Sequence, residues 1–310
     1  MSRFGILVLA VAAVGAWARP TTAQAPGRQP PSFGTGIDVI NLNVSVRDGR
    51  HYVGNLDRDA FAVYEDGIQQ EVSLFVHERL PISLVLMVDS SASMRSKLGV
   101  ARKAGARFLA TLVPEDRAQV MAFNVGVETL TPFTEDRAAL EAALAGIEGS
   151  GPTALHNALY VALKGLERQK APGELRRRAI VLLSDGEDTA SLATDEQVID
   201  LARKSEAAIY AISLRVGRSA AHRQRGFSQA AHLLTTLAQE SGGRAYFPES
   251  LSELDAVYGR VAEELRTLYS IGYVSNNRRQ DGKWRRIVVR VRDREGLEIR
   301  HKIGYYGPQG

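Results

Sequence analysis

Hydrophobic and polar residues alternate along the first patterned stretch of the chain, residues 40–46. This period of two predicts a half-buried strand, which the Asp-Gly pair at 48–49 ends. Residues 61–64 predict a second strand, and the Asp-Gly pair at 66–67 predicts a hairpin turn that leads into apolar positions within 72–76. Three or four short strands are too few to bury a core of their own, so this segment needs a partner surface.

From residue 81 the pattern changes to uninterrupted apolar runs that alternate with amphipathic helical patterns. The apolar runs lie at 83–88, 118–123, 179–183, 207–214 and 244–247. The helical patterns lie at 97–112, 137–147, 155–166, 196–205, 232–239 and 251–269, and the first of them has a predicted apolar stripe of Val100, Ala104, Phe108 and Leu112. Such alternation predicts an α/β fold with a doubly wound, mostly parallel, Rossmann-like sheet covered on both faces.

After residue 269 the period of two returns, at 269–273 and 287–291, and a last candidate strand lies at 297–303. The two β-rich flanks are each too small to fold alone, and chain termini often lie close together. We therefore expect the flanks to pair into one small β-sandwich with the α/β domain inserted between them.

The N-terminus has the pattern of a secretory signal: Arg3 precedes an uncharged, mostly apolar stretch at 4–18. An uncleaved N-terminal anchor is the alternative. The expected organisation is a signal peptide at 1–25, a linker at 26–36, an N-terminal β segment at 37–79, the α/β domain at 80–268 and a C-terminal β segment at 269–310. We expect a secreted or periplasmic protein with no membrane span after signal removal, because no later segment approaches eighteen uninterrupted apolar residues.

Composition narrows the classes of function. The 310 residues include no cysteine, which excludes disulfides, thiolate metal sites and cysteine nucleophiles. The net charge is +4, but basic residues are mostly dispersed among acidic ones. The densest basic run, residues 176–178, is predicted to be solvated surface rather than a nucleic-acid patch, so no nucleic-acid partner is expected.

The strongest candidate chemistry follows the apolar run at 83–88, where Asp89, Ser91 and Ser93 form an Asp-x-Ser-x-Ser motif. Open α/β sheets bind ligands at the carboxyl ends of their strands. Carboxylate and hydroxyl oxygens are hard donors of the kind that Mg²⁺ prefers. The alternative is a turn that caps the next helix, since Ser and Asp favour that position.

Two more oxygen-bearing residues lie where a predicted strand ends or a predicted helix begins. Thr153 stands in Gly-Pro-Thr just before a helical pattern, and Asp185 follows the apolar run at 179–183. Taken alone, Thr153 is a helix N-cap and Asp185 a strand-end turn. The nearby Glu187 and Asp188 are predicted to form an acidic surface loop, with a second cation site as the alternative.

The Asp-x-Ser-x-Ser motif, then Thr153, then Asp185 follow one another along the chain. In this order, they resemble the metal-ion-dependent adhesion site of the von Willebrand factor type A domain. With the signal and both β flanks, the chain is similar to a secreted bacterial von Willebrand A-related family best known from Acidobacteria. The stretches that carry the likeness are FAVYEDGIQQEVSLF, LVLMVDSSASM, GPTALHNAL, LLSDGEDTAS, SIGY and GYYGP.

The resemblance implies a role for each of five residues around Mg²⁺ or Mn²⁺. Ser91, Ser93 and Thr153 would supply hydroxyl ligands, while Asp89 and Asp185 would coordinate directly or through water. The remaining position would stay open for an Asp or Glu carboxylate of a partner protein, which implies an adhesion-type binding module. Many such domains have Gly-Gly-Thr where this chain has Gly-Pro-Thr, and proline stiffens that loop.

A competing hypothesis is a metal-dependent hydrolase or phosphoryl-transfer enzyme with Asp89 as its nucleophile. A phosphatase of the haloacid dehalogenase type would have a second Asp where this chain has Ser91. The chain also has no Gly-x-Ser-x-Gly elbow, His-Glu-x-x-His motif or phosphate loop. We therefore expect a binding protein rather than an enzyme. A third hypothesis is a structural domain of this type that binds no metal.

Overall fold

The computed structural model describes residues 39–309, except 172–173, 186–187, 215–219 and the side chains of 220–228. The expected signal peptide at 1–25 and linker at 26–36 lie outside the described residues. Within the described part of the chain, no helix is long and apolar enough to span a membrane.

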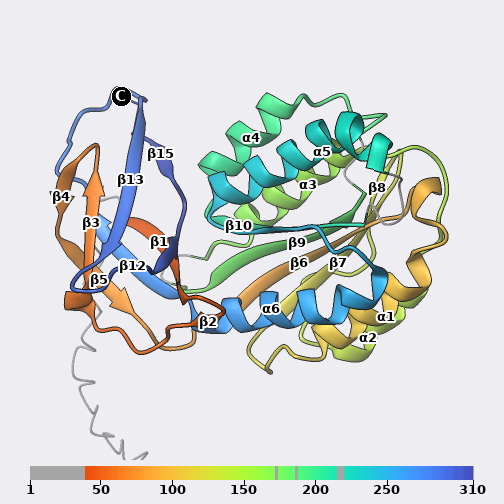
Figure 1. Ribbon diagram of the computed structural model, residues 1–310, viewed down its shortest axis with the longest axis horizontal. Coiled ribbons are helices and arrows are strands. Elements are labelled where there is room, and N and C mark those ends of the chain that lie inside the picture. Colours follow the sequence, from red (N-terminus) through yellow and green to blue (C-terminus); the bar gives the residue numbers. More distant parts are fainter. Residues whose placement is uncertain (1–38, 172–173, 186–187, 215–219, 310) are drawn as a thin grey trace, which may run out of the picture. The chain divides into compact units, whose positions relative to one another are not determined.

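The larger sheet has six strands in the order β11-β10-β9-β6-β7-β8 (Figure 1). They are β6 (Ile82–Asp89), β7 (Arg117–Phe123), β8 (Val127–Thr129), β9 (Arg177–Ser184), β10 (Ala207–Ser213) and β11 (Ala245–Tyr246). All neighbours pair in parallel except β8, which runs antiparallel to β7. The mostly parallel sheet is thus confirmed, with an antiparallel edge strand that the apolar pattern did not reveal.

Helices cover both faces of this sheet (Figure 1). They are α1 (Leu98–Leu109), α2 (Arg137–Ala145), α3 (Leu155–Arg168), α4 (Asp195–Lys204), α5 (Ala220–Ser241) and α6 (Leu254–Thr267). Side chains of α1, α2 and α6 share one buried cluster with Leu84 and Leu86, whereas α3, α4 and α5 share another with Val85 and Met87. Successive residues of β6 therefore enter opposite cores, which explains why the strand is apolar throughout.

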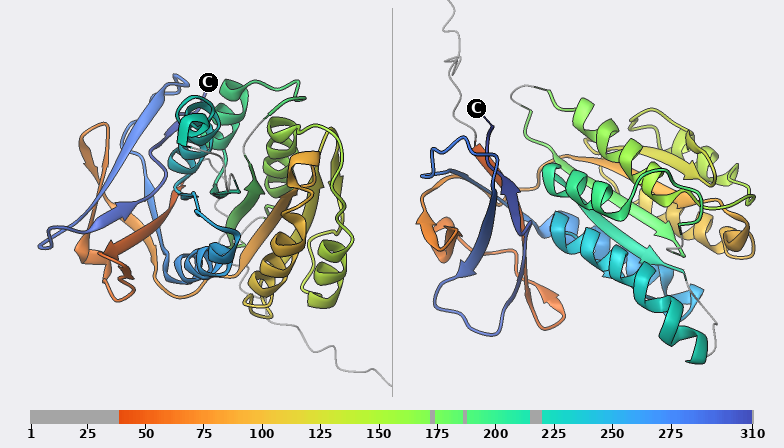
Figure 2. Two further views of the ribbon diagram at one scale, coloured as in Figure 1. Left: turned by 45° about the vertical axis from the view of Figure 1, so that its right-hand side comes forward. Right: turned by 90° about the horizontal axis from the view of Figure 1, so that it is seen from above.

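The two chain flanks form two small antiparallel sheets that share one hydrophobic core. One sheet contains β1 (Val39–Asp48), β2 (His51–Tyr52), β5 (Val72–Val76), β12 (Tyr269–Val274) and β14 (Glu298–Arg300); the other contains β3 (Phe61–Glu65), β4 (Ile68–Gln70), β13 (Trp284–Val291) and β15 (Gly304–Tyr306). N-terminal β1 pairs with C-terminal β12, and β3 pairs with β13. In both views of Figure 2 the orange and dark-blue strands run side by side. The expected pairing of the flanks into one sandwich is confirmed.

The Asp66-Gly67 turn leads into a different strand from the one expected. Both residues have positive φ, 49° and 85°, as a two-residue type I′ hairpin requires. The partner of β3 is β4, while residues 72–76 form β5, which crosses to the other sheet and pairs with β12. The predicted hairpin into 72–76 was wrong because a three-residue strand is too short to show a hydrophobic period.

The buried face of α1 also differs from the predicted stripe. Val100 is 39% exposed, although Ala104 and Phe108 are buried as expected. The residues of α1 that are buried are Leu98, Ala101, Ala104, Gly105, Phe108 and Leu109. They follow the i, i+3, i+4, i+7 spacing of a helix face, whereas a strict spacing of four drifts around the helix.

The basic run at 176–178 was wrongly predicted to be solvated. Arg177 and Arg178 belong to β9, and Arg177 is only 2% exposed. Its guanidinium donates hydrogen bonds to the carbonyl oxygens of Leu265 and Leu268, at 3.1 and 2.6 Å. Burial lowers the pKa of Arg177 to about 10. This arginine fastens the carboxyl end of α6 to the sheet, a role that a run of charges does not reveal.

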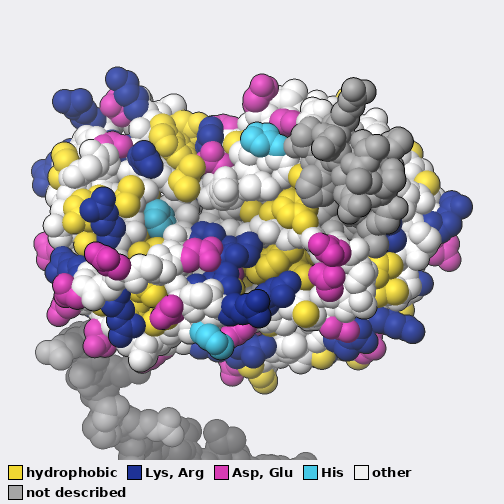
Figure 3. Space-filling model, in the orientation of Figure 1, with side chains coloured by type: hydrophobic (Ala, Val, Ile, Leu, Met, Phe, Trp, Pro, Cys, Tyr) yellow, Lys and Arg dark blue, Asp and Glu magenta, His cyan; other side chains and the backbone are white. Residues whose placement is uncertain are grey.

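Elsewhere basic and acidic side chains are interspersed, as one face shows in Figure 3.

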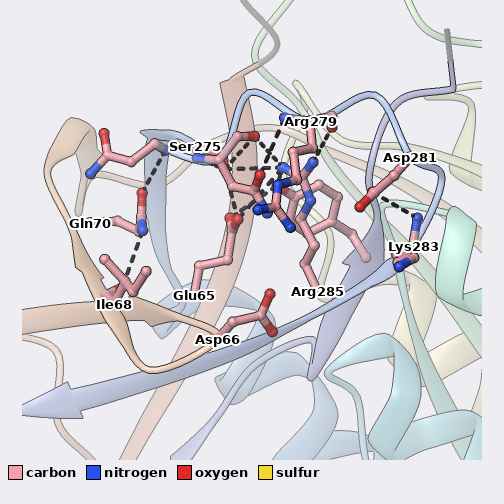
Figure 4. Close-up of polar contacts among 12 residues, drawn as sticks. Glu65, Asp66, Ile68, Gln70, Ser275, Arg279, Asp281, Lys283 and Arg285 are labelled. Atoms are coloured by element: carbon pink, nitrogen blue, oxygen red, sulfur yellow. Dashed lines mark hydrogen bonds and ion pairs between the residues drawn. The ribbon is translucent and has the colours of Figure 1, made fainter.

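A buried ion pair lies inside the sandwich (Figure 4). Glu65 and Arg285 are both almost fully buried, with Nη1 of Arg285 3.6 Å from Oε1 of Glu65. The hydroxyls of Tyr273 and Tyr305 each donate to Oε2 of Glu65 at 2.9 Å, and Ser275 donates to Oε1 at 2.7 Å. These donors satisfy the carboxylate, so the pair holds the loop that begins at Ser275 onto the sandwich.

Candidate metal centre

The neighbouring strands β6 and β9 bring two of the predicted site residues to one edge of the sheet. The parallel register pairs Val88 with Leu183, so the next residues, Asp89 and Ser184, lie at the carboxyl ends of adjacent strands. The Ser184 hydroxyl donates to Oδ2 of Asp89 at 2.6 Å. Asp185 follows directly and is also buried.

Asp89 is fixed on both of its carboxylate oxygens. Besides Ser184, the backbone N–H of Ser91 donates to Oδ1 at 2.8 Å, and the side chain is completely buried. Burial raises the pKa of Asp89, hydrogen bonds from Ser184 and Ser91 oppose that rise, and the nearby charge of Asp185 adds to it. A bound cation would relieve both the burial of this charge and the repulsion between the two carboxylates.

The Asp-x-Ser-x-Ser motif continues into a short 3₁₀ turn, η2 (Ala92–Met94). Its two hydroxyls meet, with Oγ of Ser91 3.0 Å from Oγ of Ser93. Ser91 is buried and Ser93 is exposed, so the pair reaches from the sheet edge to solvent.

The loop that carries Thr153 lies against this motif. The backbone N–H of Ala92 donates to the carbonyl oxygen of Gly151 at 2.9 Å, and that of Ser150 donates to the carbonyl oxygen of Ser90 at 2.7 Å. Gly151 has φ of 72°, which suits glycine. Thr153 itself is buried. The structure therefore brings the Thr153 loop to the edge where β6 and β9 end.

Several hydrogen bonds fasten the segment that begins at Asp188 to the Thr153 loop and to the first turn of α3. The backbone N–H groups of Thr189 and Ala190 donate to the carbonyl oxygen of Thr153 at 2.9 and 3.0 Å. Asp188 accepts from the backbone N–H of His156, in the first turn of α3, at 2.9 Å. The side-chain oxygen of Asn157 accepts from the backbone N–H groups of 192 and 193, each at 3.2 Å.

Asp188 is therefore a cap and not a surface acid. Its Oδ1 accepts from the backbone N–H of Ser191 at 3.0 Å, while Oδ2 holds the first turn of α3. Burial raises the pKa of Asp188, but hydrogen bonds from Ser191 and His156 outweigh it and leave the pKa below its ordinary value. The expected acidic surface loop needs this correction, and Glu187 lies outside the described residues.

Residues 84–187 match the family model described as the von Willebrand factor type A domain. This part of the chain is a von Willebrand factor type A domain. A UPF0353 protein of Mycobacterium leprae is 25% identical over 231 residues, which cover 67% of this chain and 66% of that protein. The chain thus spans just under two thirds of the length of this relative.

One of the matching solved structures supports the fold. The von Willebrand factor type A structure from Catenulispora acidiphila matches with a TM-score of 0.52 at 14% identity, over 90% of this chain and 75% of that one. The conserved hypothetical protein BatB from Bacteroides thetaiotaomicron is 18% identical, with a TM-score of 0.45, over 59% of this chain and 98% of that one.

The donors at the edge of this von Willebrand factor type A domain fit a small divalent cation. In octahedral coordination with Mg–O bonds of about 2.0–2.1 Å, two adjacent ligands lie about 2.9 Å apart. The Ser91 and Ser93 hydroxyls are 3.0 Å apart, which matches that spacing. Among the described residues no group of three His, Cys, Asp or Glu could hold a metal. A cation at this edge would therefore depend on hydroxyl ligands.

One further residue lies at this edge of the von Willebrand factor type A domain without having been predicted. Lys97 is the N-cap residue of α1, and its Nζ is 3.6 Å from Oδ2 of Asp185. The Asp185 carboxylate thus has a cationic side chain beside it. A lysine four residues after Ser93 gives no signal in the sequence, because the contact depends on where β9 ends.

Proposed function

We propose that this von Willebrand factor type A domain is a divalent-cation-dependent, adhesion-type protein-binding module. The proposed site holds Mg²⁺ or Mn²⁺ through five side chains. They are Asp89, Ser91, Ser93, Thr153 and Asp185.

The observation that carries this proposal is the hydroxyl pair of Ser91 and Ser93, 3.0 Å apart, beside the buried carboxylate of Asp89. Backbone hydrogen bonds already hold the Asp89 and Thr153 loops together. The ligands would therefore need little reorganisation on binding, which favours affinity.

The proposed partner is a protein that offers an Asp or Glu carboxylate. Three of the five ligands are neutral hydroxyls, so where Asp89 and Asp185 act through water, the cation keeps a directly bound shell without negative charge. When bound, the cation would supply the positive charge for an incoming carboxylate. Ser93 is exposed, which places this part of the site within reach of another protein.

The geometry of Asp89 supports binding over nucleophilic catalysis. Both of its oxygens accept hydrogen bonds and its side chain is fully buried. A nucleophilic carboxylate must reach the substrate itself, whereas a buried carboxylate can still act on a cation through a bound water. We expect hydrolase and phosphatase activities to stay at background.

Mn²⁺ titration of the full chain, by calorimetry and thermal unfolding, tests the metal site. We expect saturable binding and a rise in Tm with occupancy, because a ligand that binds only the folded state stabilises it. Ser91→Ala removes one ligand and should abolish most of both effects. Ser96→Ala, at an exposed serine nearby, is the matched control and should behave as wild type. Absence of Mn²⁺ binding to the wild type contradicts the proposal.

A second experiment tests the partner class. Immobilised wild-type protein should capture a partner from the envelope of the source cell in Mn²⁺ and release it in chelator. Capture should fail with Ser91→Ala. Replacing the partner's contacting Asp or Glu by its amide should also abolish binding, whereas unchanged binding contradicts carboxylate recognition.

We propose in addition that the chain is exported, and that it belongs with the secreted bacterial family named above. The support is the apolar stretch at 4–18 after Arg3, and the sandwich formed by both flanks. N-terminal sequencing of the protein recovered from its native cell tests export. A mature N-terminus near residue 26 supports it, and an intact Met1 in the cytoplasm contradicts it.

A further inference from the structure

Lys97 reaches the proposed metal centre from the same loop as the two serines. Its backbone N–H donates to the carbonyl oxygen of Met94 at 2.8 Å, and Met94 is fully buried. The Lys97 carbonyl oxygen accepts from the backbone N–H groups of Val100 and Ala101 at 3.1 and 3.0 Å. The start of this side chain is therefore fixed by the turn that ends the motif.

The ammonium of Lys97 lies beside Asp185, one of the five proposed ligands of the cation. Its Nζ is 3.6 Å from Oδ2 of Asp185, and the two side chains are only 17% and 8% exposed. Solvent and salt screen partly buried charges much less than exposed ones. A cation that binds Asp185, directly or through one water, would lie within a few ångströms of this ammonium.

We propose that Lys97 is a built-in competitor of the divalent cation for Asp185. Without metal, its ammonium neutralises this carboxylate at the edge of the sheet. Metal binding must either displace Lys97 from its ion pair or place two positive charges close together. Either event weakens the affinity of the site. This inference rests on the proposed function of the same site.

The experiment compares Mn²⁺ affinity by calorimetry in the full chain of wild type, Lys97→Met, Lys97→Arg and Lys103→Met. Methionine keeps the unbranched stem of the side chain without its charge, and arginine keeps the charge. Lys103 is exposed on α1, so its variant makes the same change in net charge away from the site. We expect Lys97→Met to bind Mn²⁺ about tenfold more tightly or better. The other two variants should stay close to wild type.

The outcomes separate this inference from the proposed function. Tighter binding by Lys97→Met alone, beside measurable binding by wild type, supports competition. Normal binding by wild type with equal or weaker binding by Lys97→Met overturns the inference and leaves the metal site standing. Absence of binding by both proteins overturns the inference and the metal site together.

A second measurement needs no metal. In chelator, urea unfolding of Lys97→Met, Asp185→Asn and the double variant forms a double-mutant cycle. We expect the double variant to lose less stability than the sum of the single variants, because the first substitution already removes the ion pair. Strict additivity would show that Lys97 does not hold Asp185, and would overturn the inference.

Discussion

The Ser184 hydroxyl donates a 2.6 Å hydrogen bond to Oδ2 of Asp89, and so joins the last residues of two neighbouring parallel strands. Ser184 is not one of the five proposed ligands. It occupies one oxygen of Asp89, while the backbone N–H of Ser91 occupies the other. The orientation of the buried carboxylate therefore depends on a residue that the motif does not contain.

Ser184→Ala should weaken Mn²⁺ binding by about 10–100-fold, because partners that orient a ligand commonly have effects of this size. It should also destabilise the metal-free protein by about 1–3 kcal/mol, since a buried carboxylate loses a donor. Calorimetry and urea unfolding measure the two effects. Ser213→Ala is the matched control, because Ser213 is buried and pairs with Ser184 at the end of β10. Equal Mn²⁺ affinities in the two variants would contradict this role of Ser184.

Asp188→Ala should loosen the contact between residues 188–191 and the first turn of α3. The variant loses the acceptor for the N–H groups of His156 and Ser191, so we expect a loss of about 1–2 kcal/mol, as for other helix caps. Mn²⁺ affinity should fall as well, because this segment also holds Thr153. Asp136→Ala removes the N-cap of α2, whose side chain accepts from the N–H of Ala139 at 3.1 Å. This control variant, Asp136→Ala, should lose similar stability without any change in Mn²⁺ affinity. If it lost as much Mn²⁺ affinity as Asp188→Ala, the effect would come from general destabilisation and not from the contact with the Thr153 loop.

The features that depend on local pattern could be predicted from the sequence. The apolar run of β6 and the Asp-Gly turn at 48–49 follow from burial on two faces and from backbone preference. Because β6 and β9 are neighbouring parallel strands, Asp89 and Asp185 at their carboxyl ends lie at the same edge of the larger sheet.

The remaining contacts could not be predicted because they join distant segments. Arg177 is buried only because the carbonyl oxygens of Leu265 and Leu268 accept its hydrogen bonds. Asp188 is a cap only because α3 begins beside it. A charged residue taken alone indicates solvent, and only the folded chain supplies the partners that allow its burial.

His301 should stay neutral below the pH at which an exposed histidine gains a proton. Its Nε2 accepts from the backbone N–H of Val289 at 3.0 Å, and Nδ1 lies 2.7 Å from the carbonyl oxygen of Lys302. Burial lowers the pKa of His301 below its ordinary value. The unfolded chain then takes up the proton first, so this residue's contribution to stability is complete above pH of about 6.5 and decreases below it.

The ring proton signals of His301, assigned with the variant His301→Gln, measure this behaviour by NMR. The midpoint of their pH titration should lie below the pH of about 6.5 that is ordinary for histidine. The free energy of unfolding should fall below pH of about 6.5 by at most about 1.4 kcal/mol per pH unit from this residue. A ring that titrates at or above pH of about 6.5 in the folded protein would contradict the prediction.

Glu264 on α6 is fully buried and binds residues of both the sandwich and the larger sheet. The Tyr52 hydroxyl donates to Oε2 at 2.7 Å, the Tyr210 hydroxyl donates to Oε1 at 3.1 Å, and Arg300 donates to Oε1 as well. Burial and the charge of Glu264 raise the pKa of Tyr210, so this hydroxyl stays protonated and remains a donor. Glu264 thus links β2, β10 and β14 through one carboxylate.

Glu264→Gln should destabilise the protein by about 3–5 kcal/mol, because it keeps the shape but leaves the buried guanidinium of Arg300 without its counter-charge. Tyr52→Phe removes one hydrogen bond to the carboxylate and should lose only about 1.5 kcal/mol. Adding Arg300→Met to Glu264→Gln should recover part of the loss, since no unpaired charge then remains. Urea unfolding at pH 7 measures all four proteins. A loss for Glu264→Gln no larger than for Tyr52→Phe would show that the ion pair does not stabilise the junction between α6 and the sandwich.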